Sequence, residues 1–496
     1  MGRRGVSLRP PFQPTEKRGM PMVHLTTLTV MAALLLLCVA SSKLLYRFGV
    51  PTLLIFLVLG MLFGSDGLGL IDFGDFALAR EICSAVLIFI MFYGGFGTSW
   101  KAARPVAAPA ILMSSLGTVV TAFLTGLLCR LFLHTTLLEG LLIGSVLGST
   151  DAASVFSILR ARKLNLKGGL ASLLEIESGS NDPFAYMMAI TVLTLMQPSS
   201  GAGAIVLTLA RQLGFGLLVG AAFGLAVAYG MRRLRVEVDG LYSLLIVAVA
   251  ILSYTVAESV GGNGYLSVYL AGILLGNSKM LHKRNLVHFF DGISWLAQII
   301  LFFAIGLLSF PSRFAAIIVP GVCVFLFLLL VARPAATALV LTPFRVPLRS
   351  QLFVSWVGLR GAASIVFAIF AVSEGVPLQY DLFHIVFIVA LLSAGLQGSL
   401  VPRLARKLGL VDNSVQVLKT FTDYKEEFGT QLMEFQVAPG SRWAGKSIMD
   451  ADIPEEVLVV MVRRGGETII PKGSTVLQAH DTLVLSANDF DSLLET

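Results

Sequence analysis

Apolar stretches of about 20 residues recur along most of the chain, from residue 23 to residue 402, and short polar loops separate them. A helix needs about 20 apolar residues to cross the hydrocarbon of a bilayer. Lipid offers no partner to free backbone groups, so only helices and closed barrels span it. The stretches are continuous rather than alternating, which favours helices over barrel strands. The pattern therefore predicts an all-α polytopic membrane protein.

We predict 13 transmembrane helices, one from each apolar stretch. They cover residues 23–42, 51–64, 80–98, 106–133, 138–159, 170–196, 204–231, 240–257, 264–277, 289–309, 314–341, 350–373 and 382–402. Lys and Arg residues concentrate in the loops that follow odd-numbered helices. An excess of these residues marks the cytoplasmic side of a membrane. We therefore expect the N-terminus outside the cell and the C-terminus in the cytoplasm.

The first 22 residues conflict with this orientation. Residues 1–22 contain five basic side chains, which would lie outside: Arg3, Arg4, Arg9, Lys17 and Arg18. Two explanations stay open. Either the helix count is off by one near the start, or translation begins at Met20 or Met22. We expect this tail to be disordered.

Composition agrees with a membrane protein and narrows its partners. Charged residues make up 14% of the chain and hydrophobic residues 56%, whereas soluble domains carry about 25% charged residues. The four cysteines lie inside apolar stretches and show neither metal-ligand nor disulfide spacing. The net charge of +7 comes from basic residues in short loops. We expect a lipid bilayer as the main partner, no nucleic acid and no cofactor.

Two distant segments share a pattern of small residues. GSTDAASVFSIL covers residues 148–159 and GLRGAASIVFAI covers residues 358–369. They fall in the fifth and twelfth predicted helices, which run in opposite directions, as inverted repeats of secondary transporters do. We expect two inverted six-helix repeats, with helix breaks at Thr150–Asp151 and Arg360–Gly361. Close packing of small residues is the alternative for the shared Gly-Ala-Ala-Ser pattern.

Ionisable residues inside the apolar stretches mark the candidate site. Such residues are costly in lipid and usually functional. In ESGSNDPF, residues 177–184, Ser178 and Asp182 share one helix face, and Glu177 and Asn181 share the neighbouring one. Pro183 frees a backbone carbonyl one turn earlier. The predicted intramembrane set is Asp151, Glu175, Glu177, Asp182, Arg333 and Arg360.

The polar residues of these stretches can supply the oxygen ligands that a hard monovalent cation prefers. Asp182 can supply a carboxylate, and Ser178 and Thr150 can supply hydroxyls. Arg360 is permanently charged, and we expect it to form a structural ion pair with Glu177. Asp182 is then left to hold either a proton or a cation, which predicts exchange of one for the other.

Three other interpretations remain. Asp182 could be a further salt-bridge partner, although two arginines are too few for four carboxylates. A cation channel or a symporter could use the same fold. An intramembrane aspartyl protease could use Asp151 and Asp182, but their flanks lack the Tyr-Asp and Gly-x-Gly-Asp patterns of those enzymes.

The composition changes after residue 408. Residues 409–430 contain a run of charged residues and are predicted to form a linker. Residues 431–496 contain short apolar or alternating runs between Gly and Pro turns, as strands do. We expect a transmembrane domain over residues 23–408 and a small cytoplasmic α/β domain over residues 431–496.

Three motifs make the chain resemble bacterial cation–proton antiporters of the NhaP type, in the potassium/proton branch. They are STDAASVF (149–156), EIESGSNDP (175–183) and GLRGA (358–362). The resemblance implies an NhaA-like fold, a homodimer and residence in the bacterial inner membrane. It implies exchange of K⁺, or alternatively Na⁺, for H⁺.

The resemblance also implies roles for individual residues. Asp182 would bind the ion and the proton, helped by Thr150 and Ser178, and Asn181 and Asp151 would complete the cation- and proton-binding set. Asn181 would mark an electroneutral subfamily, Glu177 would pair with Arg360, and Asp151 would cap a half-helix. Many relatives have proline where this chain has Ala152 and Ser364, which affects the fine geometry of the crossing.

The C-terminal part resembles the C-terminal lobe of regulators of potassium conductance, also called a TrkA-C or RCK-C domain. Such lobes usually dimerise and bind a small regulatory ligand. A docking module without a ligand is the alternative.

Overall fold

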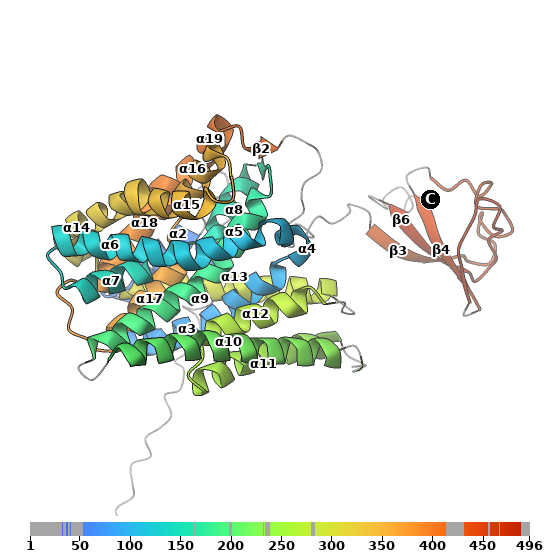
Figure 1. Cartoon of the computed structure of the whole chain (residues 1–496). Coiled ribbons are helices and arrows are strands. Elements are labelled where there is room, and N and C mark those ends of the chain that lie inside the picture. Colours follow the sequence, from blue (N-terminus) through green and yellow to red (C-terminus); the bar gives the residue numbers. More distant parts are fainter. Residues whose placement is uncertain are drawn as a thin grey trace, which may run out of the picture. The chain divides into compact units, whose positions relative to one another are not determined.

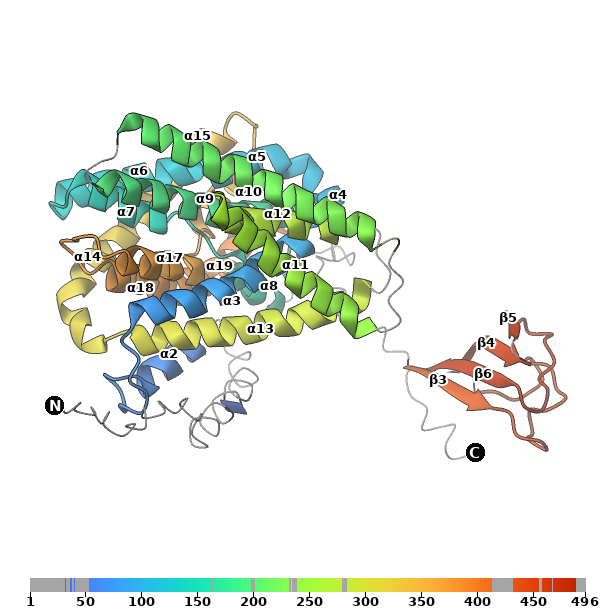
Figure 2. The same cartoon turned by 90° about the horizontal axis from the view of Figure 1, so that it is seen from below.

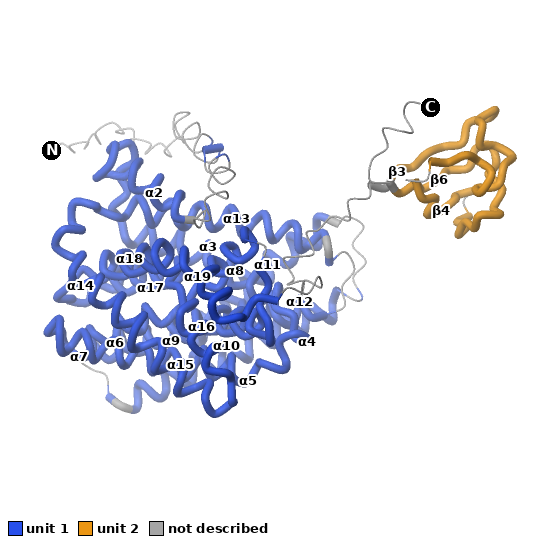
Figure 3. The backbone as a smooth tube through the Cα atoms, turned by 90° about the horizontal axis from the view of Figure 1, so that it is seen from above, with its two compact units in different colours: residues 1–417 blue, residues 418–496 orange. Residues whose placement is uncertain are grey.

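The structure is a computed structural model. It describes residues 53–162, 164–197, 201–231, 233, 239–278, 283–412, 431–454, 457–465 and 467–487, and the isolated positions 32, 36, 37 and 40. The chain divides into two compact units, residues 1–417 and residues 418–496 (Figure 3). The predicted tail over residues 1–22 falls outside the described residues, as do nearly all of the first predicted helix and of the predicted linker.

The first unit is built of helices (Figure 1). Seven continuous helical stretches in the described residues are long and apolar enough to cross a membrane. The α-helices are α2 (Leu53–Phe63), α3 (Phe76–Gly97), α4 (Trp100–Ala103), α5 (Ala107–Leu112), α6 (Thr118–Phe132), α7 (Leu137–Val146), α8 (Ala152–Ala161), α9 (Leu170–Met196), α10 (Ala202–Gly230), α11 (Asp239–Ser259), α12 (Gly264–Gly276), α13 (Lys283–Leu308), α14 (Phe314–Phe327), α15 (Arg333–Leu341), α16 (Leu348–Trp356), α17 (Ala362–Ser373), α18 (Leu382–Leu392) and α19 (Gly398–Lys407).

Several of these helices join into longer ones through local irregularities. Short 3₁₀ turns lie at Arg104–Val106 and Pro311–Arg313. Turns of π-helix lie at Met113–Gly117, Leu328–Ala332 and Ser393–Gln397. Each of the 12 apolar stretches predicted from residue 51 onward overlaps one helix or a chain of such helices. The total of 13 spans and the inverted repeats stay predictions.

Two predicted spans are broken, as their polar residues indicated. The span over 138–159 divides into α7 and α8, and the span over 350–373 divides into α16 and α17. The two breaks touch each other. The Asp151 N–H donates to the Leu359 carbonyl at 2.8 Å. A Cβ on Gly361 would lie 2.5 Å from the Asp151 carboxylate, so this close approach requires glycine.

Helix α9 runs through the middle of this unit (Figures 1 and 2). It packs against α5, α7, α10, α12 and α17. Gly179 meets the ring of Tyr269 on α12, where a Cβ would lie 2.6 Å from the hydroxyl oxygen. Helix α9 continues past Pro183, whose own carbonyl accepts a hydrogen bond from the Asn263 side chain at 2.8 Å. Small residues before the proline therefore allow α12 to approach the centre of the unit.

A short strand pair lies at the end of the first unit. β1 (Asn165–Leu166) occupies the loop between α8 and α9, and β2 (Val411–Asp412) follows α19. The two strands are antiparallel, with Asn165 opposite Asp412 and Leu166 opposite Val411. The chain that leaves the last helix is thereby fixed to the loop that precedes α9.

The second unit is an antiparallel sheet. Its strands are β3 (Gln431–Gln436), β4 (Leu458–Arg464), β5 (Glu467–Ile469) and β6 (Thr482–Ala487), in the order β3-β6-β4-β5. Trp443, Val462 and Leu483 lie in its core. Asp481 is buried and accepts two hydrogen bonds from Arg464, both at 2.8 Å.

The described part of this unit is a sheet domain, and the helix that an α/β domain requires stays a prediction. Between residues 431 and 487, the described segments contain strands and turns and no helix. The connection from β3 to β4 includes Gly440 and Gly445, both with φ of +83°. Gly445 then donates its N–H to the Leu477 carbonyl at 2.7 Å, across the sheet end. A left-handed glycine does not continue an α-helix, so Gly440 and Gly445 interrupt helical structure in the connection from β3 to β4.

Candidate ion-binding site

Asp182 lies on α9 where this helix passes the break between α7 and α8. Its side chain is buried. The Ser149 hydroxyl donates a hydrogen bond to its Oδ1 atom. Within the described part of the chain, Ser149 is its one hydrogen-bond partner, so most of the capacity of the carboxylate stays uncommitted. Ser149 lies in the STDAASVF motif, but nothing in that motif favours it over Thr150 as a partner of Asp182.

Asn181 fastens α9 to the same break. Its side-chain oxygen accepts a hydrogen bond from the Thr150 N–H at 3.3 Å, and its amide nitrogen donates to the Thr150 hydroxyl oxygen at 2.5 Å. The Asn181 side chain is fully buried. A neutral amide thus positions Thr150 next to the carboxylate without adding a second charge.

Ser178, one turn before Asp182, satisfies backbone groups that the break leaves free. Its hydroxyl donates to the Thr150 carbonyl at 2.7 Å and accepts from the Ala152 N–H at 2.9 Å. Ser178 was expected to coordinate a cation. In this structure its hydroxyl hydrogen is directed to backbone, and an oxygen lone pair remains for a ligand.

Asp151 caps α8, as expected from its place after the break. Its carboxylate accepts from the Ser154 N–H at 3.0 Å and from the Ser154 hydroxyl at 2.6 Å. Asp182 is bonded to Ser149 instead, so the two aspartates have separate hydrogen-bond partners. Among the described residues, no hydrogen bond links the two carboxylates directly.

The expected ion pair between Glu177 and Arg360 is corrected by the structure. Glu177 forms its ion pair with Arg333, at the start of α15, and both side chains are buried. Arg360 donates from Nη1 to the Ser149 carbonyl at 2.8 Å. Because Arg360 is part of one break, its guanidinium satisfies a carbonyl freed by the other. Arg333 was recognised as an intramembrane charge, but sequence spacing could not pair it.

The donor set at Asp182 consists of oxygen atoms. Asp182, Ser149, Thr150 and Ser178 bring a carboxylate, hydroxyls and backbone carbonyls to the break. No group of three or more His, Cys, Asp or Glu side chains suited to a metal occurs among the described residues. Oxygen ligands suit hard cations rather than soft transition metals.

A sequence model described as "Sodium/hydrogen exchanger, transmembrane" matches residues 31–407, and a TrkA-C domain model matches residues 432–492. The chain belongs to the sodium/hydrogen exchanger family. This result confirms the resemblance indicated by the three motifs and by the C-terminal part. The family is a family of transporters and not of enzymes.

Exchanger relatives cover most of the chain. The K(+)/H(+) antiporter NhaP of Alkalimonas amylolytica is 34% identical over 470 residues, which are 94% of this chain and 82% of the relative. The K(+)/H(+) antiporter NhaP2 of Shewanella baltica is 33% identical over 458 residues, which are 91% of this chain and 79% of the relative. The Na(+)/H(+) antiporter ApNhaP of Aphanothece halophytica is 24% identical, covering 74% of this chain and 71% of the relative.

A solved exchanger has the same fold. The structure of the sodium proton antiporter MjNhaP1 from Methanocaldococcus jannaschii superimposes with a TM-score of 0.69 at 22% identity. The match covers 78% of this chain and 99% of that one. The arrangement of broken helices around α9 thus belongs to a known exchanger architecture.

Proposed function

We propose that this exchanger carries one monovalent cation, K⁺ or alternatively Na⁺, against one proton, with Asp182 as the exchanging group. The observation that carries the proposal is a buried carboxylate at the crossing of two broken helices, held by a single hydroxyl from Ser149. The names of the K(+)/H(+) relatives support potassium.

Competition at one carboxylate explains coupling. A carboxylate removed from water is costly to keep charged unless a cation is present. Asp182 therefore favours either protonation or cation binding. If the protein changes its accessible side only when Asp182 is occupied, each proton moves against one cation.

The neighbouring residues set the stoichiometry. Asn181 is neutral and is used to position Thr150. The Asp151 carboxylate is used to cap α8. One exchanging carboxylate remains, so one proton is exchanged for one singly charged cation, and the cycle is electroneutral.

A bound cation would take its ligands from α9 and from the break that crosses it. We propose Asp182 as the anionic ligand and the Thr150 and Ser178 oxygens as neutral ligands. Ser149 joins this set because it already contacts the carboxylate. Arg360 at the Ser149 carbonyl and the Glu177–Arg333 pair hold the surrounding backbone in place.

The remaining features of the proposal come from topology and resemblance. The two crossing breaks support inverted repeats and alternating access. The charge pattern of the loops supports a cytoplasmic C-terminus and an external N-terminus in the bacterial inner membrane. A homodimer is proposed for the assembly, and a regulatory role with a small ligand for the C-terminal unit.

The direct test is Asp182→Asn, in which an amide replaces the carboxylate at nearly equal size. Everted membrane vesicles are given K⁺, Na⁺, Rb⁺ or Li⁺, and proton release is followed with a fluorescent pH probe. We expect exchange to be abolished with every cation while the purified protein keeps its thermal stability. Retained exchange in Asp182→Asn contradicts the proposal.

The matched control is Asp72→Asn, which changes an exposed aspartate bonded to Ser65. It should exchange as the wild type does. A channel is distinguished by clamping the membrane potential. Proton movement through an electroneutral exchanger is unaffected by the potential, whereas channel flux follows it.

A further inference from the structure

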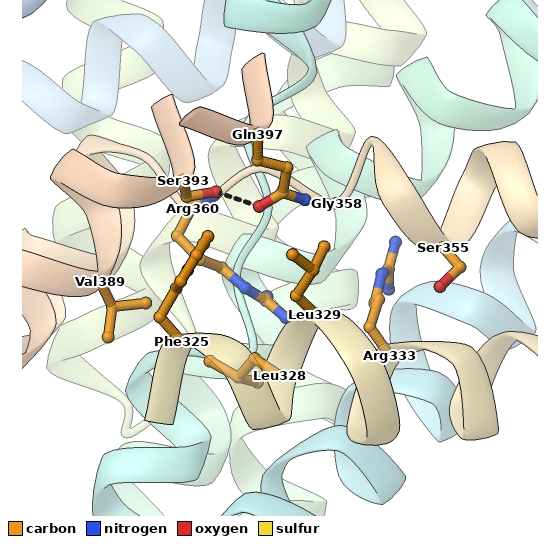
Figure 4. A pocket seen from close by; sticks show the side chains of 10 residues that line it. All are labelled: Phe325, Leu328, Leu329, Arg333, Ser355, Gly358, Arg360, Val389, Ser393 and Gln397. Carbon is orange, nitrogen blue, oxygen red and sulfur yellow. Dashed lines mark hydrogen bonds between the residues drawn. The ribbon is translucent and has the colours of Figure 1, made fainter. Parts of the chain in front are cut away.

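A cavity beside the second break contains two buried arginine side chains. It lies between α14, the break before α17, and the π turn Ser393–Gln397 (Figure 4), and it has room for a group of about the size of one water molecule. Arg333 and Arg360 reach into it from different elements, and each is only 3% exposed. Turns of π-helix often occur at functional sites, and two of them border this cavity.

The cavity has an excess of positive charge. No carboxylate lines it among the described residues. Glu177 pairs with Arg333, while the Arg360 guanidinium donates to the neutral Ser149 carbonyl. The charges that act most on Arg360 are Arg333 and Glu177, so two guanidiniums share one carboxylate. Guanidinium groups stay protonated in proteins, and an unbalanced buried charge is strongly destabilising.

The neutral polar groups of the wall are already paired with each other. Ser393 accepts the Arg360 backbone N–H at 3.0 Å and donates to Gln397 at 2.8 Å. Gln397 in turn donates to the Trp356 carbonyl. By contrast, the buried Nε of Arg333 has no hydrogen-bond partner in the described residues. The buried Nε of Arg333 therefore lacks an acceptor, and an anion would supply one and also balance the charge.

We propose that this cavity binds a small monovalent inorganic anion of the halide class. A single negative charge balances the one positive charge in excess, which a phosphate dianion would not. Phe325, Leu328 and Val389 supply an apolar wall, which suits a weakly hydrated anion better than a strongly hydrated one. The site is separate from Asp182, whose hydrogen bond goes to Ser149 on the other break.

The experiment uses the full-length protein in detergent. Chloride is exchanged stepwise for gluconate at constant K⁺ and ionic strength, and the thermal unfolding midpoint is measured. A ligand that binds only the folded state raises its stability. We expect the midpoint to rise by several degrees with chloride and bromide and then to saturate. Equal midpoints in chloride and gluconate would overturn the proposal.

Two variants of one wall residue sharpen the test. Gln397→Glu places a fixed carboxylate at the cavity, so it should remove the response to chloride. Gln397→Leu has a similar size and adds no charge, so it should keep the response. A chloride response of wild-type size in Gln397→Glu contradicts the assignment. None of these measurements depends on ion exchange, so they stand apart from the proposed function.

A second inference rests on the strand pair β1–β2. β1 joins α8, which Asp151 caps, to α9, which carries Asp182. Besides the strand register, the Lys167 N–H donates to the Leu410 carbonyl at 2.9 Å. Leu166 and Leu410 also share a buried cluster with Val155 and Ile158 of α8. A shift of β2 would therefore displace residues that contact both α8 and α9, the two helices of the candidate site.

We infer that the C-terminal unit alters exchange by drawing β2 away from β1. The chain passes from β2 toward that unit, which begins at residue 418. Gly168 and Gly169, with φ of +68° and +72°, lie between β1 and α9. Their left-handed conformation marks a sharp change of direction between the strand pair and α9, where a rotation of the backbone would move the start of α9. This inference rests on the proposed exchange function.

A reversible disulfide cross-link between β1 and β2 tests whether the C-terminal unit acts through this strand pair. Leu166→Cys and Val411→Cys occupy opposite positions of the pair, and they are introduced into a cysteine-free chain with or without residues 431–496. In the reduced state, we expect the two lengths to exchange with different pH and cation dependence. In the oxidised state, they should behave alike. Exchange in reduced protein verifies the function itself. A difference that persists after complete cross-linking, or no difference in either state, would overturn the inference.

Discussion

The two helix breaks each separate a pair of short helices, and their chemistry is opposite. In the first break, Ser149 and Thr150 turn to α9, and Asp151 caps the following half-helix. In the second, Arg360 reaches back to the Ser149 carbonyl, and Gly361 precedes α17 without a side-chain cap. One break thus presents the oxygen atoms that we propose as ion ligands, and the other presents an arginine that bonds the backbone of the first break.

Helix ends explain this division. A helix carries a partial positive charge at its N-terminus and a partial negative charge at its C-terminus. The Asp151 carboxylate lies at the N-terminus of α8. The Arg360 guanidinium bonds a carbonyl beyond the C-terminal end of α7. Both helix ends at the first break are therefore balanced by an ionised side chain, and Asp182 is left as the proposed exchanging group.

The largest expected loss of stability comes from removing the arginine that pairs with Glu177. Arg333→Met leaves Glu177 buried without its partner and should cost about 3–5 kcal/mol of stability. Arg360→Met loses a charged hydrogen bond to a carbonyl and should cost about 1.5–3 kcal/mol. Thermal midpoints and expression level in membranes report both losses.

A double-mutant cycle separates the two arginines. In a Glu177→Gln background, Arg333→Met should become much less harmful, whereas Arg360→Met should cost as much as before. Strong coupling of Glu177 to Arg360 and weak coupling to Arg333 would instead restore the pairing expected from the sequence.

A smaller effect is expected from Gly361→Ala. The added Cβ would lie 2.5 Å from the Asp151 carboxylate, and overpacking of this kind costs about 1–3 kcal/mol. The added methyl group would push the two breaks apart. The exchange rate and the thermal unfolding midpoint should therefore both fall. Gly94→Ala on α3 is the control, because its Cβ meets no atom within 4 Å. Equal behaviour of the two variants would show that the breaks are not in tight contact.

The smallest effect is expected at the helix cap. Asp151→Ala removes the cap of α8 and should cost about 1 kcal/mol. Asp151→Ser retains a capping oxygen and should keep both stability and exchange. If Asp151→Ser folds normally but loses exchange, Asp151 is an ion ligand, which was the expectation from the sequence, and not only a cap.

The sequence predicted elements better than it predicted contacts. Apolar length located the helical stretches, and small and polar residues located both breaks, because these features act within a few residues of chain. Partners such as Glu177 and Arg333 lie 156 positions apart. Their meeting depends on how α9 and α15 pack, and spacing within one helix carries no information about it.

Contacts between distant segments were also not predictable in the candidate site and in the second unit. Asp182, Asn181, Thr150 and Ser178 were identified from their types and spacing, and the structure brings them together at the first break. The contact of Ser149 with Asp182 depends on the direction of an extended backbone, which the sequence does not reveal. In the second unit, the alternating pattern located the strands, whereas the predicted helix does not occur among the described residues.

The central claim is that a proton and a cation compete for Asp182. It is tested most directly by measuring the apparent KM for K⁺ at a series of pH values, in proteoliposomes without a membrane potential. Where the carboxyl group is mainly protonated, competition at one group predicts that KM falls about tenfold for each unit of rising pH, while the maximal rate at saturating K⁺ stays constant. An apparent KM that does not change with pH would contradict the account.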